Sequence, residues 1–174
     1  MKLIANVLLF QAAWCASIFG AAAGNAWLGP ACMAVLVVIH VLIASTRRAD
    51  LRTIPICSAI GIIAEMLTTT ISGTTFAAHT PAALPIPLWM AAIWPGFATL
   101  LNSSMAWMQT RPLIAIAFGA IGGPVAYYGG ASAGAVRLGD SPALALAAVA
   151  IQYAVLMPIL CAIARTLAAR YRTT

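Results

Sequence analysis

Acidic residues are scarce in this chain. Only three of its 174 residues are Asp or Glu, against nine Lys or Arg, which gives a formal net charge of +6. Charged residues make up 7% of the chain and hydrophobic residues 63%, and the mean hydropathy is +1.00. So little polar surface excludes a water-soluble globule of this size. The composition predicts a single integral-membrane domain over residues 1–174, with membrane lipids as its surroundings.

Metal-binding and disulfide patterns are also missing. The four cysteines are isolated in sequence, each inside a long apolar stretch, and the only histidines are His40 and His79. We therefore expect no metal, no cofactor and no disulfide framework. No nucleophile–base pair is recognisable either, so enzymatic activity stays uncertain, nearer no. The basic residues are scattered over short loops and a tail, which favours anionic lipid head groups over nucleic acid as their partners.

Six long apolar stretches predict six transmembrane helices, since a span needs roughly 20 mostly apolar residues. They cover about residues 3–23, 27–45, 54–72, 87–108, 112–130 and 142–164. Of the nine basic residues, only Arg137 falls on one side of this arrangement; on the other are Lys2, Arg47, Arg48, Arg52, Arg111, Arg165, Arg170 and Arg172. Because positively charged loops stay in the cytoplasm, we predict an all-α, multi-pass, compact six-helix bundle in the bacterial inner membrane, with both termini cytoplasmic.

Two segments have more than one interpretation. The first apolar stretch, after Lys2, resembles a secretory signal ending in Ala21–Ala23. It is longer than the usual apolar core and contains Asn6 and Gln11, which favours a retained helix, while cleavage stays open. The longest predicted loop, Gly73–Ile86, is either a segment that lies back over the bundle or a plain connector, the simpler interpretation.

Small residues recur on one face of two predicted helices. In the first helix this face holds Ala12, Ala16, Gly20 and Gly24, and the fifth helix carries glycines from 119 to 130. Small residues let helices approach closely in lipid. We expect these two helices to be the closely packed ones, and the first face to be available to a second copy or a partner subunit. The run Gly122-Gly123-Pro124 predicts a kink or local break.

Polar side chains are expected inside the bundle. Counting about 1.5 Å per residue from the basic ends puts Gln11, His40, Glu65, Asn102 and Gln152 in one slab, in the cytoplasmic half and toward the midplane. Ionisable groups inside a membrane often mark function. With no Lys or Arg in a span to neutralise it, Glu65 is predicted to be protonated, or hydrogen-bonded to His40, Asn102, Gln11 or a water. The alternative is that these groups only hold helices together.

Aromatic residues divide by depth. Trp89 and Trp107, near opposite ends of the fourth predicted helix, are expected to anchor it at the two interfaces, and Tyr127–Tyr128 to belong to the outer aromatic belt. Trp14 and Trp94 lie deeper, so each needs a hydrogen-bond partner or lines a cavity.

Three motifs together resemble a known family. They are Asn6-x4-Gln11-x2-Trp14, then Trp94-x2-Phe97-Ala98-Thr99-Leu100-Leu101-Asn102-x-Ser104-x2-Trp107, and finally Gly119-Ala120-x2-Gly123-Pro124-x2-Tyr127-x-Gly129. The chain resembles small bacterial membrane proteins grouped as domain of unknown function 2878, over most of its length. The resemblance implies family and span count, not an activity. The family pattern has a histidine where this chain has Ser103, which argues against a mechanism that needs an imidazole there.

The expected function is binding or handling of a lipid-like or other amphiphilic molecule in a polar cavity. The candidate ligand-binding residues are Gln11, Trp14, His40, Glu65, Trp94, Asn102 and Gln152. In an enzymatic form Glu65 would be the acid or base, with His40 or Asn102 orienting the reacting group. Two alternatives stay open: a small solute carrier or substrate-binding subunit of a transporter, and an accessory subunit without a ligand. A cavity open outward favours the carrier, and one open to the inner leaflet favours lipid handling.

Overall fold

The fold is all-α, as predicted. The computed structural model describes residues 3–79 and 85–171, so Lys2, Pro81 and Arg172 lie outside the described residues. The described chain forms six α-helices: α1 Leu3–Ala22, α2 Leu28–Ile43, α3 Arg47–Ser72, α4 Leu88–Leu101, α5 Pro112–Ser132 and α6 Pro142–Arg170. A short 3-10 helix, η1 Ala106–Met108, lies between α4 and α5. Two strands of two residues, β1 Thr75–Phe76 and β2 Val136–Arg137, pair antiparallel.

Four of these helices, α1, α3, α5 and α6, are long and apolar enough to cross a membrane by length and composition. The other two, α2 and α4, are apolar but have 16 and 14 residues, or about 24 and 21 Å at 1.5 Å per residue. Large apolar side chains cover the outside of the bundle: Leu113 is 79% exposed and Ile71 81%. Such an apolar exterior indicates a membrane protein.

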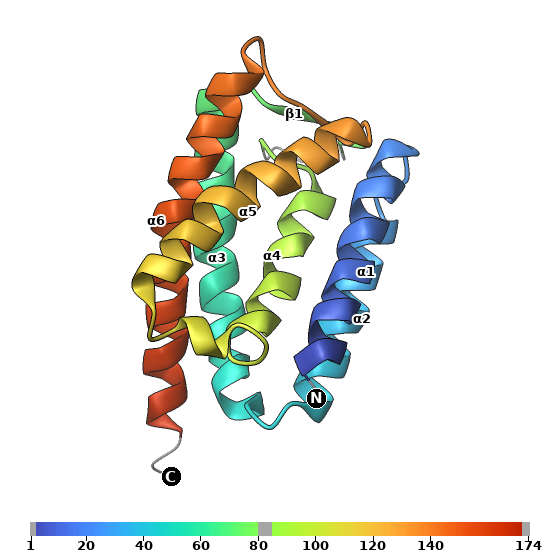
Figure 1. Cartoon of the computed structure of the whole chain (residues 1–174). Coiled ribbons are helices and arrows are strands. Elements are labelled where there is room, and N and C mark those ends of the chain that lie inside the picture. The colour runs from blue at the N-terminus through green and yellow to red at the C-terminus, as the bar shows by residue number, and fades with distance from the viewer. Residues whose placement is uncertain (1–2, 80–84, 172–174) are drawn as a thin grey trace.

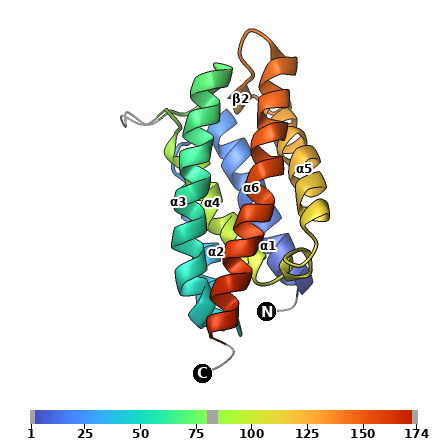
Figure 2. The same ribbon diagram turned by 90° about the vertical axis from the view of Figure 1, so that its left-hand side faces the viewer.

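The helices surround α4, which packs against α1, α2 and α3. As Figures 1 and 2 show, α1 pairs with α2 on one side, α3 and α6 run side by side on the other, and α5 leans across from α6 toward the end of α1. The two ends of the described chain lie at the same end of the bundle, opposite the β1–β2 pair (Figure 1).

Three helix boundaries differ from those predicted. Helix α3 begins at Arg47, not near residue 54, because the buried face of Gly61 and Glu65 continues back through Cys57 and Ile54 at helical spacing. The predicted fourth span over 87–108 ends as a helix at Leu101 and continues as turns and η1. Helix α6 extends to Arg170, and α5 runs unbroken through Pro124, without the predicted local break.

The two helices with small-residue faces do pack closely, each against its neighbour in sequence. A methyl group at Gly119 would lie 2.1 Å from the Tyr153 carbonyl oxygen, so α5 and α6 approach at backbone distance. On α1, Gly20 faces Leu28 of α2, where a methyl group would lie 3.1 Å from its Cβ. Gly24 is in the turn after α1, with φ +79°, and so is not on the helix.

The described part of the Gly73–Ile86 loop lies back over the end of the bundle, so the plain-connector interpretation is wrong there. Strand β1 pairs with β2, and the Phe76 ring lies 5.8 Å from the Trp89 ring and 6.5 Å from the Tyr127 ring, centroid to centroid. The Trp89 indole N–H donates to the Ala77 carbonyl oxygen at 2.9 Å. The loop therefore closes this end over aromatic side chains.

Two of the residues expected at the interfaces are instead buried. Trp89 is fully buried under the loop, and Tyr127 is 4% exposed, so neither is an interfacial anchor. Trp107 is half exposed, with the Arg111 guanidinium 5.6 Å from its ring, and Tyr128 is 65% exposed. Of the two neighbouring tyrosines expected in the outer aromatic belt, Tyr128 is thus exposed and Tyr127 is buried.

Candidate functional site

The polar residues predicted to share one slab belong to different sites. His40 and Asn102 contact another buried carboxylate, Asp50, in the first turn of α3. Glu65 and Gln152 meet two tyrosines further along α3. Gln11 lines a cavity with Trp14 and Trp94.

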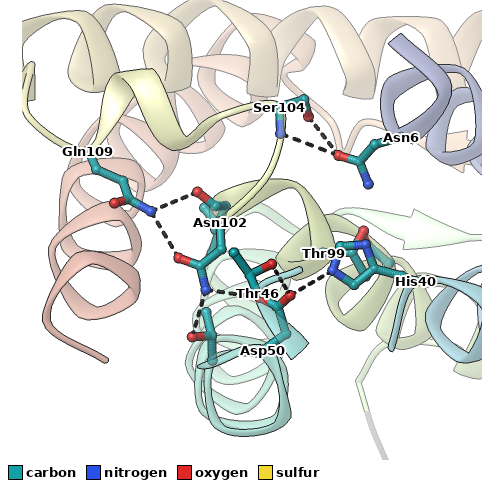
Figure 3. A network of polar contacts seen from close by, with 11 residues as sticks. Asn6, His40, Thr46, Asp50, Thr99, Asn102, Ser104 and Gln109 are labelled. Atoms are coloured by element: carbon teal, nitrogen blue, oxygen red, sulfur yellow. Dashed lines mark hydrogen bonds and ion pairs between the residues drawn. The ribbon is translucent and has the colours of Figure 1, made fainter. Parts of the chain in front are cut away.

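The first site, called here the Asp50 network, centres on a carboxylate with no solvent exposure. One oxygen, Oδ2, lies 2.9 Å from His40 Nε2 and accepts from the Thr46 hydroxyl at 2.6 Å. The other, Oδ1, accepts from the Asn102 amide at 2.9 Å (Figure 3). A His40 ring protonated at Nε2 would donate this bond to the carboxylate. Both oxygens of Asp50 thus have partners, from α2, from the α2–α3 turn and from Asn102 directly after α4.

Asn102 extends this network to the segment after α4. Its amide also donates to the Thr53 hydroxyl at 3.1 Å, and its carbonyl oxygen accepts from Gln109 Nε2 at 3.0 Å. The same Gln109 nitrogen donates to the Leu101 carbonyl at the end of α4, at 2.8 Å. These bonds satisfy polar groups at the point where α4 stops, and they fix the turn there.

Sequence reasoning missed Asp50 because Arg47, Arg48 and Arg52 mark its surroundings as a charged loop. A signal was present in the helical spacing: Asp50 lies four residues before Ile54, on the face that continues to Glu65. The expected pairing of Glu65 with His40, Asn102 or Gln11 is therefore wrong. His40 and Asn102 instead contact the other buried carboxylate, Asp50.

The second site, called here the Glu65 cluster, consists of Glu65, Tyr127, Gln152 and Tyr153. Glu65 is fully buried. Its Oε1 accepts a short hydrogen bond from the Tyr127 hydroxyl, and its Oε2 accepts from Gln152 Nε2 and from the Tyr153 hydroxyl, both at 3.2 Å. The cluster joins α3, α5 and α6. Gln152 Oε1 is buried without a partner among the described residues.

The tyrosines of this cluster gave little sequence signal. Tyr127 has an exposed neighbour, Tyr128, and sits near a helix end, where the aromatic belt is the commoner reading. Tyr153 follows Gln152 directly, and neighbouring residues of a helix point in different directions. The sequence therefore gave no reason to expect that both side chains reach Glu65, as they do. A buried carboxylate in an apolar chain needs donors, and tyrosine hydroxyls are the donors that an apolar helix can carry at low cost.

The third site is a cavity of about 370 Å³ among α1, α4, α5 and α6. It is lined by Phe10, Gln11, Trp14, Ile93, Trp94, Phe97, Phe118, Gly119, Gly122, Gly123, Val125, Ala126, Tyr153 and Met157. Gln11, Phe118 and Val125 are exposed and form its outer rim, so the cavity opens sideways between α1 and α5. Its volume lies within the range of small-molecule sites.

Glycines of α5 form one wall of this cavity. A methyl group at Gly122 would meet nothing closer than the Phe118 ring at 3.9 Å, so this wall is open. The opposite wall holds Trp94, whose indole lies against Gly61 and whose Nε1 has no partner among the described residues. Trp94 thus meets the expectation for a deep tryptophan that lines a cavity.

Tyr153 connects the cavity to the Glu65 cluster. Its ring lines the cavity, 5.7 Å from the Trp94 ring, while its hydroxyl donates to Glu65 Oε2. Among the described residues, no Lys, Arg, His, Asp or Glu lines the cavity, and Gln11 is its one amide side chain. Such a surface holds an apolar or aromatic group by packing, and it differs from the polar cavity expected in the cytoplasmic half.

Fold and site together define a helical membrane protein with an apolar cavity that opens to the side of the bundle. The family model described as Protein of unknown function (DUF2878) matches residues 3–159, and the chain belongs to this family. The resemblance found in the sequence motifs is thereby confirmed. No curated protein matches the chain, and no solved structure does.

Proposed function

We propose that this protein binds a lipid-like or other amphiphilic molecule whose apolar chain lies in the cavity between α1 and α5. The observation that carries the proposal is a cavity of about 370 Å³ with aromatic and glycine walls and an exposed apolar rim. A ligand of this kind enters from the surrounding hydrocarbon without crossing a polar surface. The candidate contacts are Gln11, Trp14 and Trp94, together with Tyr153 and Gly122.

The strength of such binding does not come from the hydrophobic effect, because lipid tails are already an apolar solvent. The apolar chain of a ligand gains binding free energy only from what the cavity offers beyond bulk lipid. These gains are closer packing against aromatic rings and any contact with polar groups. Trp14, Trp94 and Phe97 offer flat faces for this packing, and Gly122 leaves room for it. The proposal therefore predicts selectivity for a particular ligand shape rather than general affinity for lipid.

The topology that belongs to this proposal has six spans and both termini in the cytoplasm of a bacterial inner membrane. Its support is that the start of α1 and the end of α6 share one end of the bundle with the start of α3 (Figures 1 and 2). Arg47, Arg111 and Arg165 belong to segments at that end, whereas Arg137 is in β2 at the other. The short helices α2 and α4 complete their crossings with the turns that flank them.

The solute-carrier alternative is less well supported. A carrier loaded from outside would have its cavity open past the Gly73–Ile86 loop, but β1, β2 and Phe76 cover that end of the bundle. An enzyme with Glu65 and His40 as an acid–base pair is also disfavoured, because the two side chains have separate sets of partners. Lipid handling without catalysis is what the sideways opening favours.

Native mass spectrometry of the purified protein tests the proposal. We expect an amphiphile to remain bound to the wild-type protein and to be lost from Gly122→Trp, because the indole fills the open wall of the cavity. The matched control is Ile121→Trp, since Ile121 is 66% exposed and outside the lining. Equal retention by both variants would place the ligand elsewhere, and no ligand in any of the three would favour an accessory subunit.

A further inference from the structure

The three acidic residues of the chain have different electrostatic surroundings. Asp140 is exposed, and Asp50 lies 2.9 Å from the His40 ring nitrogen. Glu65 is fully buried, and its hydrogen-bond partners are two tyrosine hydroxyls and a glutamine amide, all of them neutral. Among the described residues, Glu65 is therefore the buried acidic side chain that has no basic side chain in contact with it.

The cavity beside Glu65 is suited to a cation on independent grounds. Six of its lining side chains are aromatic: Phe10, Trp14, Trp94, Phe97, Phe118 and Tyr153. The face of an aromatic ring carries negative potential and attracts alkylammonium groups, with tryptophan the strongest. In the described part of the chain no positively charged side chain lines the cavity, so none competes for these faces.

Tyr153 couples these two features. Its hydroxyl donates to Glu65 Oε2 at 3.2 Å, while its ring lines the cavity and lies at 30° to the Trp94 ring. Donation to a carboxylate moves electron density from the O–H bond toward the oxygen and the ring, which makes the ring face more negative. A cation against Tyr153 therefore gains from the ring and from the carboxylate behind it.

We propose that the cavity selects amphiphiles with a positively charged, alkylammonium-type head, held against Trp94 and Tyr153 with Glu65 as the counter-charge, while the apolar chain runs along Trp14 and Phe97 to the opening between α1 and α5. The inference rests on the proposed function and adds the charge of the ligand to it. An anionic head at the same position would be repelled by Glu65 in a poorly screened interior. A neutral head would gain packing alone.

The experiment compares three ligands that share a ten-carbon chain: decyltrimethylammonium, decyl glucoside and decyl sulfate. Binding to the full chain in a neutral maltoside detergent is titrated by native mass spectrometry. In the wild type we expect the cation to bind at least about tenfold more tightly than the anion. Glu65→Gln should lower the affinity for the cation about fivefold or more and leave that for decyl glucoside within about twofold.

Asp140→Asn is the matched control, because it removes the same charge from an exposed loop and should change neither affinity. Tyr153→Phe keeps the ring but removes the bond to Glu65, and should reduce the preference for the cation without abolishing it. A preference retained in full by Glu65→Gln would overturn the role of Glu65. The comparison of the three ligands in the wild type needs no variant. It therefore tests the preference for a cation even where Glu65→Gln does not fold.

The outcomes also separate this inference from the proposed function. Equal affinities of the wild type for all three ligands, with loss of all three in Gly122→Trp, would overturn charge selection and leave amphiphile binding intact. Failure of all three ligands to bind the wild type would overturn both.

Discussion

The two buried carboxylates of α3 are both fully buried and hydrogen-bonded, yet their surroundings differ. Asp50 is in the first turn of the helix, where the free N–H groups and the helix dipole favour negative charge. Its donors come from helix ends and turns: Thr46 before α3 and Asn102 after α4. Glu65 is inside the helix, away from either end, and its donors Tyr127 and Tyr153 are residues within α5 and α6 and not in turns.

This difference indicates two roles. Asp50 is hydrogen-bonded to three chain segments at helix ends, so it fixes where those helices begin or end. Neither Asp50 nor these partners are among the described residues that line the cavity. The Glu65 cluster also joins three helices, but one of its members, Tyr153, is a wall of the cavity. We therefore assign the Asp50 network to the fold and the Glu65 cluster to the ligand.

The largest effect is expected at Asp50. Asp50→Asn removes the charge of a carboxylate that accepts from Thr46 and Asn102 and lies 2.9 Å from His40 Nε2, so charge-assisted hydrogen bonds in a buried site become neutral ones. We expect the free energy of unfolding to fall by about 3 kcal/mol. Titration with SDS in mixed micelles measures this. Asp140→Asn should change it by less than about 0.5 kcal/mol, and an equal effect of the two variants would contradict the role of Asp50.

The next effect concerns the support of the Glu65 cluster. Gly119→Ala puts a methyl group 2.1 Å from the Tyr153 carbonyl oxygen, so α5 and α6 must move apart. We expect a loss of about 2 kcal/mol in the same titration. The displacement should also weaken binding in the cavity while the Asp50 network stays intact. Wild-type stability for this variant would show that the two helices do not pack as described.

A smaller effect on stability is expected for Glu65→Gln. The hydroxyls of Tyr127 and Tyr153 rotate and can accept as well as donate, so an amide in place of the carboxylate keeps its hydrogen bonds. We expect a loss of about 1 kcal/mol, clearly below that of Asp50→Asn. The comparison of these two isosteric changes is the direct check on the two roles. A larger loss at Glu65 than at Asp50 would reverse the assignment.

The smallest effect is expected at Gly122, one turn from Gly119 in the same helix. A methyl group there meets only open cavity, and alanine favours a helix over glycine. Gly122→Ala should therefore raise the free energy of unfolding by about 0.5 kcal/mol. Thermal unfolding beside Gly119→Ala measures the contrast. Destabilisation of both variants alike would mean that Gly122 does not face a cavity.

The sequence predicted the helices because their apolar runs are long, and it predicted that Trp14 and Trp94 line a cavity. Gln11, which was expected inside the bundle, is instead exposed at the rim of that cavity. It could not predict which polar groups would meet, because counting residues from a helix end gives only a rough depth and no tertiary contacts. That count left His40 and Asn102 near Glu65, and it treated Asp50 as part of a loop. Asp50 and Glu65 share one face of α3 but are about 22 Å apart along it, so His40 and Asn102 reach Asp50 while the tyrosines reach Glu65.

The boundaries that failed share a physical cause. The side chains of Arg47, Arg48 and Arg52 are exposed on the first turns of α3, so a segment that its charges marked as a loop is helical. At Asn102 the apolar run continues past the end of α4, because side-chain hydrogen bonds, not apolar character, end that helix. Tertiary contacts of single polar residues determine both the start of α3 and the end of α4. Amino-acid composition does not reveal such contacts.

The central claim is that a ligand chain lies between α1 and α5, and photocrosslinking tests it most directly. A decyltrimethylammonium analogue with a diazirine on its chain would be bound, irradiated and mapped by peptide mass spectrometry. We predict adducts concentrated in the segments Phe10–Trp14 and Phe118–Ala126, and their loss in Gly122→Trp but not in Ile121→Trp. Adducts spread evenly over exposed apolar residues such as Ile71 and Leu144, unchanged by either variant, would contradict the account.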